Sequence, residues 1–409
     1  MNARHMFATL AAIALANAAA AGRFQHRAHD PRADAAGEPF ARTLRHLAAV
    51  ADTAARDSAA REAAGRVRKG GRPVVDDSSV VFLYYGDARR VGVPSDLNGW
   101  NAAADTMTRV PGTRLFHLRK RVEREARFEY KLAADSVWML DPCNARTVMG
   151  GYGPNSEIWM PGYAPPREIL RDPAVPHGRV DTIRFASALL GRTHPVFVYR
   201  PPGYARTRTY PVVYVTDGGE YITLALMLNV LDNLIAAGRL RPMMAVFVDP
   251  RTDPADAATS KRMLDYTMSD SFVRFLADEL RPRILRSYRS THDPAQTGIM
   301  GASLGGLIAT YAAYRRPDAF GIAAAQSPSF WWNEGRMIGL VRDSLAVPVR
   351  FWIDTGTIRD AQEGSRQMRD VMRRRGYDVA YREQPEAHNW ANWRARLDDI
   401  LCHFWGTGR

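Results

Sequence analysis

The 409-residue sequence contains little cysteine and no long hydrophobic run. Its two cysteines, Cys143 and Cys402, exclude a disulfide-dense scaffold. They fall in different predicted domains, so we expect two unpaired thiols. The apolar stretch at residues 6–18 is too short to cross a bilayer, and no other stretch is long enough, so we expect no stable membrane span. No internal repeat is apparent, which argues against a solenoid.

Acidic residues are also in deficit, with 43 Asp and Glu against 56 Lys and Arg, a formal net charge of +13. The excess is carried mostly by arginine and favours anionic partners, such as anionic small molecules or an anionic envelope surface. An arginine-preferring genome explains the same excess without any partner. No basic cluster is interleaved with aromatic residues, so we expect no nucleic-acid partner.

The N-terminal region reads as an export signal followed by a spacer. Residues 1–21 combine a short basic start, an alanine-rich apolar run and a small-residue cleavage site, which predicts a signal peptide. We therefore expect an exported protein, periplasmic or secreted, with a retained N-terminal anchor as the open alternative. Residues 22–77 are rich in Ala and Arg and are predicted to form a spacer, partly helical or disordered.

Residues 78–166 change to short β-type runs such as 80–85, 115–118 and 128–132, separated by turn signals such as Asn98-Gly99. This pattern predicts a small all-β, immunoglobulin-like sandwich.

Residues 167–409 show apolar β-type runs, most of the later ones separated by helical segments. Such alternation predicts an α/β fold with a mostly parallel sheet covered by helices on both faces. The predicted strands are residues 180–185, 195–199, 212–216, 244–248, 299–301, 322–326, 349–354 and 379–383.

The most informative segment is Gly301-Ala302-Ser303-Leu304-Gly305, which lies between an apolar strand and a helix-forming run. A Gly-x-Ser-x-Gly pattern in that context is the nucleophile elbow of an α/β-hydrolase. The serine needs a strained turn to present its hydroxyl, and side chains at the two glycines would collide across that turn. The backbone N–H of Leu304, the residue after the nucleophile, is the first candidate for an oxyanion hole.

The catalytic base and acid follow the serine in chain order in this fold. Of the two later histidines, His388 comes directly after the last predicted strand, whereas His403 lies in a terminal helical segment and is expected to be structural. His388 is therefore the predicted general base. The acid is expected after the 349–354 strand, where Asp354, Asp360 and Glu363 are all candidates.

Three segments carry a resemblance to the esterase D superfamily, and in particular to the enterochelin esterases. They are residues 301–307 (GASLGGL), 326–332 (QSPSFWW) and 388–394 (HNWANWR). The family patterns read "GQSxGGL", "SQSGSxWW" and "GGHDxxxWR", so this chain departs from them at Pro328 and at Ala387-His388-Asn389. These departures leave the reaction class intact and put the substrate in question.

The resemblance also implies roles for further residues. Residues 355–360 (TGTIRD) match the family's "GIRE" acid loop with one extra residue, which favours Asp360 as the acid, with Asp354 second. The "DGxxW" pattern at residues 217–221 implies that the N–H of Gly219 completes the oxyanion hole. Arg262 and Asp265 fall on an "RxxE" segment, and their i, i+3 spacing favours a structural ion pair. No metal or cofactor is implied.

The sandwich resembles the early-set domain that precedes the catalytic domain in glycogen-branching enzymes and enterochelin esterases. The segments are residues 95–100 (SDLNGW), 130–131 (YK) and 140–144 (LDPCN). In related glycogen-binding modules, aromatic and polar residues hold sugar rings, and the corresponding positions here are Trp100, Lys131, Trp138 and Asn155. The competing interpretation is that both indoles pack the domain or its interface with the hydrolase.

Taken together, these patterns predict a serine esterase that cleaves carboxylic esters through an acyl-enzyme, most like an enterochelin (siderophore) esterase. One alternative is a feruloyl or acetylxylan esterase acting on polysaccharide. A second is a non-catalytic glycan-binding protein with a decayed hydrolase domain. The expected partner is a small-molecule or polysaccharide ester.

Overall fold

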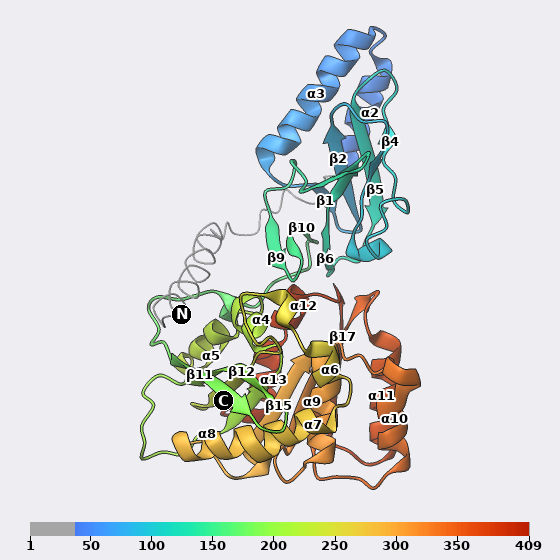
Figure 1. The fold of residues 1–409 in the computed structure, drawn as a ribbon. Coiled ribbons are helices and arrows are strands. Elements are labelled where there is room, and N and C mark those ends of the chain that lie inside the picture. Colours follow the sequence, from blue (N-terminus) through green and yellow to red (C-terminus); the bar gives the residue numbers. More distant parts are fainter. Residues whose placement is uncertain (1–36, 409) are drawn as a thin grey trace.

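The computed structural model describes residues 37–408, which form two domains (Figure 1). The predicted signal peptide and the first part of the predicted spacer lie outside these residues. Within them, no helix combines the length and apolarity that a membrane crossing would need. Both cysteines are free thiols.

The larger domain is built on an eight-stranded sheet in the order β11-β12-β14-β13-β15-β16-β17-β18. The first two strands pair antiparallel with their neighbours, and all later pairs are parallel. The strands are β11 (Arg179–Ser187), β12 (Arg192–Arg200), β13 (Val212–Val215), β14 (Met244–Val248), β15 (Thr297–Ala302), β16 (Ile322–Gln326), β17 (Arg350–Ile358) and β18 (Val379–Ala387). All eight predicted strands are present, and the α/β-hydrolase prediction is confirmed.

Helices cover both faces of this sheet, because successive strand residues point to opposite sides. Val212 and Tyr214 of β13 face one core, while Val213 and Val215 face the other. The first core is covered by α7 (Asp270–Arg274), η5 (Phe275–Leu280), α9 (Leu304–Arg315), α10 (Trp332–Asp343) and α11 (Gln362–Arg374). The second is covered by α4 (Gly218–Thr223), α5 (Met227–Ala236), α12 (Trp390–Arg394) and α13 (Leu397–Trp405). The remaining helices here are η3 (Arg167–Ile169), η4 (Ala257–Thr259), α6 (Arg262–Tyr266), α8 (Arg281–Ser287) and η6 (Pro294–Gln296).

The smaller domain, which we call the β-domain, holds three antiparallel sheets around one core. Their orders are β1-β2-β5-β4, β6-β10-β9 and β3-β7-β8. The strands are β1 (Val74–Asp76), β2 (Ser79–Tyr85), β3 (Val91–Gly92), β4 (Thr108–Arg109), β5 (Leu115–Arg121), β6 (Arg127–Tyr130), β7 (Leu132–Ala134), β8 (Val137–Met139), β9 (Thr147–Gly150) and β10 (Gly153–Trp159), with a short η2 (Asp96–Asn98).

Two helices from the predicted spacer, α2 (Gly37–Ala49) and α3 (Thr53–Gly70), form an additional layer on this domain. Val80 and Phe82 of β2 face the β-domain core, whereas Val81 and Leu83 face the helices. The strand is therefore buried on both sides, which explains its unbroken apolar sequence. The sequence indicated only partial helicity here and did not predict the packing.

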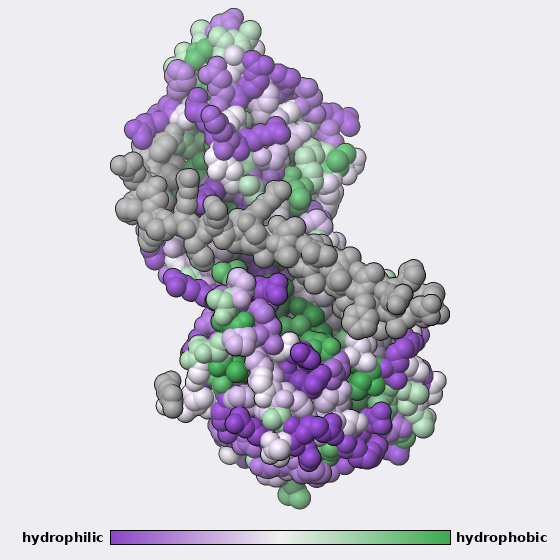
Figure 2. All heavy atoms as spheres, turned by 90° about the vertical axis from the view of Figure 1, so that its left-hand side faces the viewer, coloured by the Kyte–Doolittle hydropathy of each residue, from purple (hydrophilic) through white to green (hydrophobic). Residues whose placement is uncertain are grey.

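The two domains meet where β6 and β9 contact β18 and α12 (Figure 1). On the face drawn in Figure 2, hydrophilic side chains prevail over both domains, with apolar side chains in scattered small groups. The domain contact lies at the edge of the large sheet where its parallel strands end. That edge is where ligands bind in open α/β sheets.

Candidate active site

Ser303 occupies a strained turn between β15 and α9. Its backbone has φ 59° and ψ −121°, a conformation that costs a non-glycine residue about 1–3 kcal/mol. A Cβ atom at Gly301 or Gly305 would lie 2.0 or 2.5 Å from Thr216 Oγ1, so neither position tolerates a side chain. The turn therefore has the geometry of a nucleophile elbow.

The elbow is tied to the end of the neighbouring strand β16. The N–H of Ser303 donates to the carbonyl of Gln326 at 2.9 Å, and the N–H of Ser329 donates to the carbonyl of Ser303 at 3.0 Å. The Oγ atoms of Ser303 and Ser329 are 3.3 Å apart. Ser303 is half-buried and Ser329 is buried, so a second hydroxyl lies next to the proposed nucleophile on its buried side.

The structure brings Asp360 and His388 together. Asp360 Oδ1 lies 2.6 Å from His388 Nδ1, and the imidazole is 40% exposed while the carboxylate is fully buried. This arrangement favours a proton on Nδ1 and leaves Nε2 as the free basic nitrogen. The two residues follow β17 and β18, so their loops lie at the same sheet edge as the elbow.

Asp360 is held as an ionised carboxylate. Ser327 Oγ and the N–H of Gly356 each donate to Oδ2 at 2.6 Å. Burial alone would raise the pKa of Asp360, but the hydrogen bonds from His388, Ser327 and Gly356 lower it below its ordinary value. An ionised partner is what a triad histidine needs as it becomes charged.

Asp354, the second candidate acid, makes different contacts. Its Oδ2 accepts from Trp352 Nε1 at 2.7 Å, and the side chain is fully buried within the sheet. Burial raises the pKa of Asp354 to about 7. It does not hydrogen-bond His388, which is paired with Asp360 instead.

One aromatic side chain, that of Trp393, packs against the imidazole of His388. The two rings form a T-shaped contact, with centroids 5.1 Å apart and planes at 89°. The indole N–H of Trp393 donates to Ser327 Oγ at 3.0 Å, and that hydroxyl in turn donates to Asp360. Base, acid and indole therefore form one continuous hydrogen-bonded and packed unit.

The predicted oxyanion donors both lie in the first turns of helices. Leu304 is the first residue of α9 and Gly219 the second of α4, positions whose N–H groups have no partner within their own helix. A Cβ atom at Gly219 would lie 2.3 Å from Asp249 Oδ2 and 2.5 Å from Arg251 Nη2. A side chain at this position would displace the Asp249 carboxylate and the Arg251 guanidinium from their ion pair.

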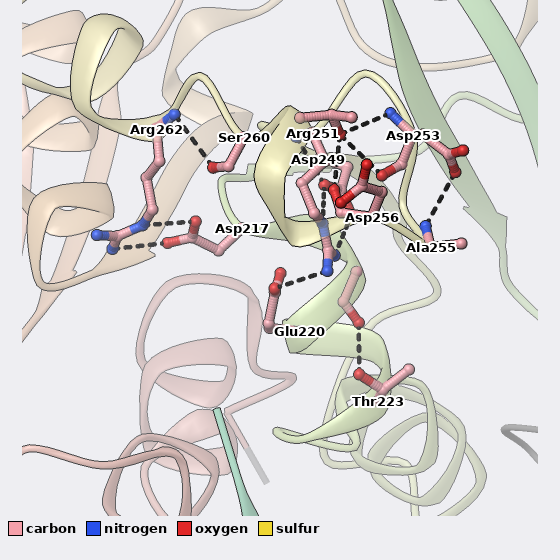
Figure 3. Close-up of polar contacts among 12 residues, drawn as sticks. Asp217, Glu220, Thr223, Asp249, Arg251, Asp253, Ala255, Asp256, Ser260 and Arg262 are labelled. Atoms are coloured by element: carbon pink, nitrogen blue, oxygen red, sulfur yellow. Dashed lines mark hydrogen bonds and ion pairs between the residues drawn. The ribbon is translucent and has the colours of Figure 1, made fainter. Parts of the chain in front are cut away.

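Arg262 joins the start of α4 to the elbow, and Figure 3 shows its ion pair with Asp217. Its Nε and Nη2 donate to the two oxygens of Asp217 at 2.8 and 3.0 Å, and Nη2 also reaches the carbonyl of Ala302 at 3.1 Å. The predicted ion pair of Arg262 with Asp265 is wrong, because Asp265 pairs with Arg192 instead. Asp217 and Asp265 are both buried, and each has its own arginine as a counter-ion, Arg262 for Asp217 and Arg192 for Asp265.

A second arginine supports the same end of α4. Arg251 pairs with Asp249 at 2.6 Å and with Glu220 at 3.2 Å, and Figure 3 shows its guanidinium between these two carboxylates. Burial raises the pKa of Glu220 to about 7, with nearby carboxylates adding to the effect. The first turn of α4, which carries Gly219, is thus held by two ion pairs, Arg262 with Asp217 and Arg251 with Glu220.

The four predicted sugar-binding residues of the β-domain do not share one environment. Trp100 is half-buried, and its indole N–H donates to Asp96 Oδ1 at 3.0 Å. The Asn155 amide donates to Glu129 Oε2 at 2.7 Å.

The other two are Trp138, which is 48% exposed on β8, and Lys131, which is half-buried between β6 and β7. Two of the four side chains are therefore already engaged by carboxylates of their own domain.

Sequence reasoning missed two features of the site. Ser327 and Ser329 belong to the matched QSPSFWW segment, yet nothing in the pattern said that one hydroxyl holds the acid and the other lies beside Ser303. The contact of Asn389 with the β-domain has no signal in a single sequence, since its partners Asp96 and Arg127 lie 293 and 262 residues away. Among residues 37–408, no group of three or more His, Cys, Asp or Glu could hold a metal ion.

Comparisons with known proteins point to esterases. The chain is 27% identical over 240 residues to an iron(III) enterobactin esterase of Dickeya dadantii, covering 54% of each chain. It is 25% identical over 235 residues to an endo-1,4-beta-xylanase/feruloyl esterase of Xylanibacter ruminicola, covering 55% of this chain and 31% of the relative. The match thus spans about half, or less, of these relatives' length.

A solved structure shows the same fold. The enterobactin esterase FES of Shigella flexneri superposes with a TM-score of 0.69 at 20% identity, covering 81% of this chain and 94% of that one. The family model described as putative esterase matches residues 187–404, more than half of the chain. The chain therefore belongs to this esterase family.

Proposed function

We propose that the protein is a serine esterase that hydrolyses carboxylic esters through an acyl-enzyme at Ser303. The observation that carries the proposal is the 2.6 Å contact of a buried Asp360 with an exposed His388, at the sheet edge where a strained Ser303 also lies. Family membership supports the same reaction class.

In the proposed reaction, His388 Nε2 takes the proton of Ser303 Oγ as this oxygen attacks the ester carbonyl carbon. The N–H groups of Gly219 and Leu304 stabilise the negative charge on the carbonyl oxygen, and losing one such donor typically costs about 3 kcal/mol. The imidazolium, whose charge Asp360 stabilises, then gives its Nε2 proton to the leaving oxygen, so that the C–O bond breaks and the alcohol departs. Water, deprotonated by His388, cleaves the acyl-enzyme and restores Ser303.

For the substrate, we propose a catecholate siderophore ester of the enterochelin type. Support comes from the enterobactin esterases among the relatives, from the matched sequence patterns and from the net charge of +13, which suits an anionic substrate. Hydrolysis of enterobactin, methyl ferulate, acetylxylan and p-nitrophenyl acetate by one preparation tests this. Fastest turnover of methyl ferulate or acetylxylan would replace it with the polysaccharide-ester alternative, which the feruloyl esterase relative favours.

Export to the periplasm or beyond remains part of the proposal, resting on the pattern of residues 1–21, as does the early-set kinship of the β-domain. The non-catalytic alternative is disfavoured by the joined acid and base. A fluorophosphonate probe tests it directly, since a decayed hydrolase would not be labelled, whereas the proposed enzyme is labelled and Ser303→Ala is not.

A further inference from the structure

The β-domain contacts both loops that carry the proposed acid and base. Ile358, two residues before Asp360, packs against the core of the β-domain. The guanidinium of Arg359 lies over Gly99, where an added Cβ atom would be 3.3 Å from Nε. The acid loop is therefore seated on the β-domain as well as on the sheet that it leaves.

The base loop is bound more closely, through Asn389. This residue directly follows His388, and its Nδ2 donates to Asp96 Oδ2 at 2.9 Å. Its Oδ1 accepts from Arg127 Nη1 at 2.9 Å and, as the cap of α12, from the N–H of Asn392 at 3.1 Å. The amide thus joins η2, β6 and α12 at one point beside the imidazole.

The two β-domain partners are themselves fixed. Arg127 is fully buried and forms ion pairs with Glu129 at 2.9 Å and with Glu157 at 2.6 Å. Asp96 accepts from the N–H of Glu129 at 2.8 Å and from the indole of Trp100. Burial, with the charge of Glu129 adding to it, raises the pKa of Asp96 to about 7. Because these side chains are buried and hydrogen-bonded to one another, they have few alternative conformations. They can therefore hold the Asn389 side chain in one position.

We propose that Asn389 is a positioning residue through which Asp96 and Arg127 of the β-domain hold the His388 loop in its working geometry. The β-domain is then part of the machinery of hydrolysis and not only an appended binding module. This inference rests on the proposed esterase function. It explains why Trp100, in the predicted sugar-binding turn, has its indole N–H directed to Asp96.

The contacts of Asn389 with Asp96 and Arg127 require an amide side chain at this position. Asn389 must donate to a carboxylate on one side and accept from an arginine on the other. An aspartate in its place could accept from Arg127 but would set a second carboxylate against Asp96. Misplacing a catalytic group by about 1 Å can cost on the order of 10²-fold in rate. We therefore expect Asn389→Ala and Asn389→Asp to lower kcat about 10- to 100-fold, with KM changed less than about 3-fold.

The experiment measures kcat and KM for p-nitrophenyl acetate with the full chain, normalised to the concentration of Ser303 that a fluorophosphonate titrates. The variants are Asn389→Ala, Asn389→Asp and the latter combined with Asp96→Asn. The combined variant removes the repulsion, so it is expected to recover several-fold in kcat over Asn389→Asp alone.

The matched control is Asp57→Ala, which removes the 2.7 Å contact of α3 with Tyr85 and the 2.8 Å bond from the Arg114 N–H, on the helix-covered side of the β-domain. We expect it to lower the melting temperature and leave kcat unchanged.

The proposal is supported if kcat falls in both Asn389 variants, recovers in the combined variant and is unchanged in Asp57→Ala. Unchanged kcat per titrated site in Asn389→Ala and Asn389→Asp would overturn the positioning role while leaving the esterase function in place. A wild-type chain that neither turns over esters nor reacts with the probe would overturn both. If Asn389→Ala does not fold, the similarly sized Asn389→Asp, with and without Asp96→Asn, decides alone.

Discussion

Replacing Asp360 by asparagine tests the assignment of the acid, and the structure gives the size of the effect. Oδ1 accepts from His388 Nδ1 at 2.6 Å and from the N–H of Ala361 at 2.7 Å, while Oδ2 accepts from Ser327 Oγ and from the N–H of Gly356. An asparagine has only one accepting oxygen for these two sets of donors. Whichever way the amide turns, its NH₂ group faces a backbone N–H.

The catalytic loss follows from the tautomer. If the NH₂ group faces His388, it must donate to Nδ1, which places the imidazole proton on Nε2, where the proton of Ser303 has to be received. The same asparagine change in a serine-protease triad lowers kcat about 10⁴-fold, which corresponds to about 5.5 kcal/mol. We expect a loss of this order for Asp360→Asn in steady-state hydrolysis of p-nitrophenyl acetate.

Asp354→Asn is the matched control. Asp354 accepts from Trp352 Nε1, and its pKa of about 7 means that a neutral side chain is already well populated near neutral pH. The isosteric amide keeps one oxygen for the indole, so we expect less than about a 10-fold change in kcat. If Asp354→Asn proved the more damaging change, the acid would have to be reassigned to the end of β17.

Gly301→Ala sets a Cβ atom 2.0 Å from Thr216 Oγ1, and we expect it to lower the free energy of unfolding, measured in urea, by about 3 kcal/mol or more. A loss below about 1 kcal/mol would mean that the elbow relaxes to accept the methyl group. The pKa of Asp360 is lowered in the fold, so its contribution to stability is fully present above the unfolded pKa of about 4 and is lost as the pH falls through the lower folded value. The stability gap between wild type and Asp360→Asn, measured by urea unfolding, should therefore shrink from about pH 7 to about pH 2, and a constant gap would show that the pKa is not shifted. Combining Trp100→Ala with Trp138→Ala should lower the melting temperature, and isothermal titration of the unaltered chain with maltoheptaose or xylohexaose should show no saturable binding; clear saturation would restore the sugar-platform interpretation.

The features of the fold that depend on residues close together in the sequence were predicted correctly. Each strand of the large sheet has its own apolar run, and the elbow is defined by glycines only two positions from Ser303, so both were readable from the sequence. His388 could be chosen because it directly follows the last strand. Asp360 could be preferred only through the resemblance, since three acids share one loop and spacing alone does not select among them.

The remaining features depend on partners far away in the chain. Arg262 has a carboxylate three residues on, yet it binds Asp217, while that nearer carboxylate, the buried Asp265, is paired with Arg192 of β12. Each buried carboxylate thus has a counter-ion that lies far from it in the sequence. The packing of α2 and α3 on β2 likewise depends on the face of β2 that the β-domain core does not cover. A strand buried on both faces has no alternation of polar and apolar residues, so its sequence does not indicate what packs on either face.

The central claim is a covalent acyl-enzyme at Ser303, and trapping that intermediate tests it most directly. Rapid mixing with p-nitrophenyl acetate, acid quench and peptide mass analysis should find one acetyl group on the peptide that contains Ser303, together with a burst of p-nitrophenol equal to the enzyme concentration. His388→Ala should suppress both signals. The account would be contradicted by a linear time course without a burst, if the acetyl group were found on another residue. It would also be contradicted if turnover were sustained without a burst and no peptide carried an acetyl group.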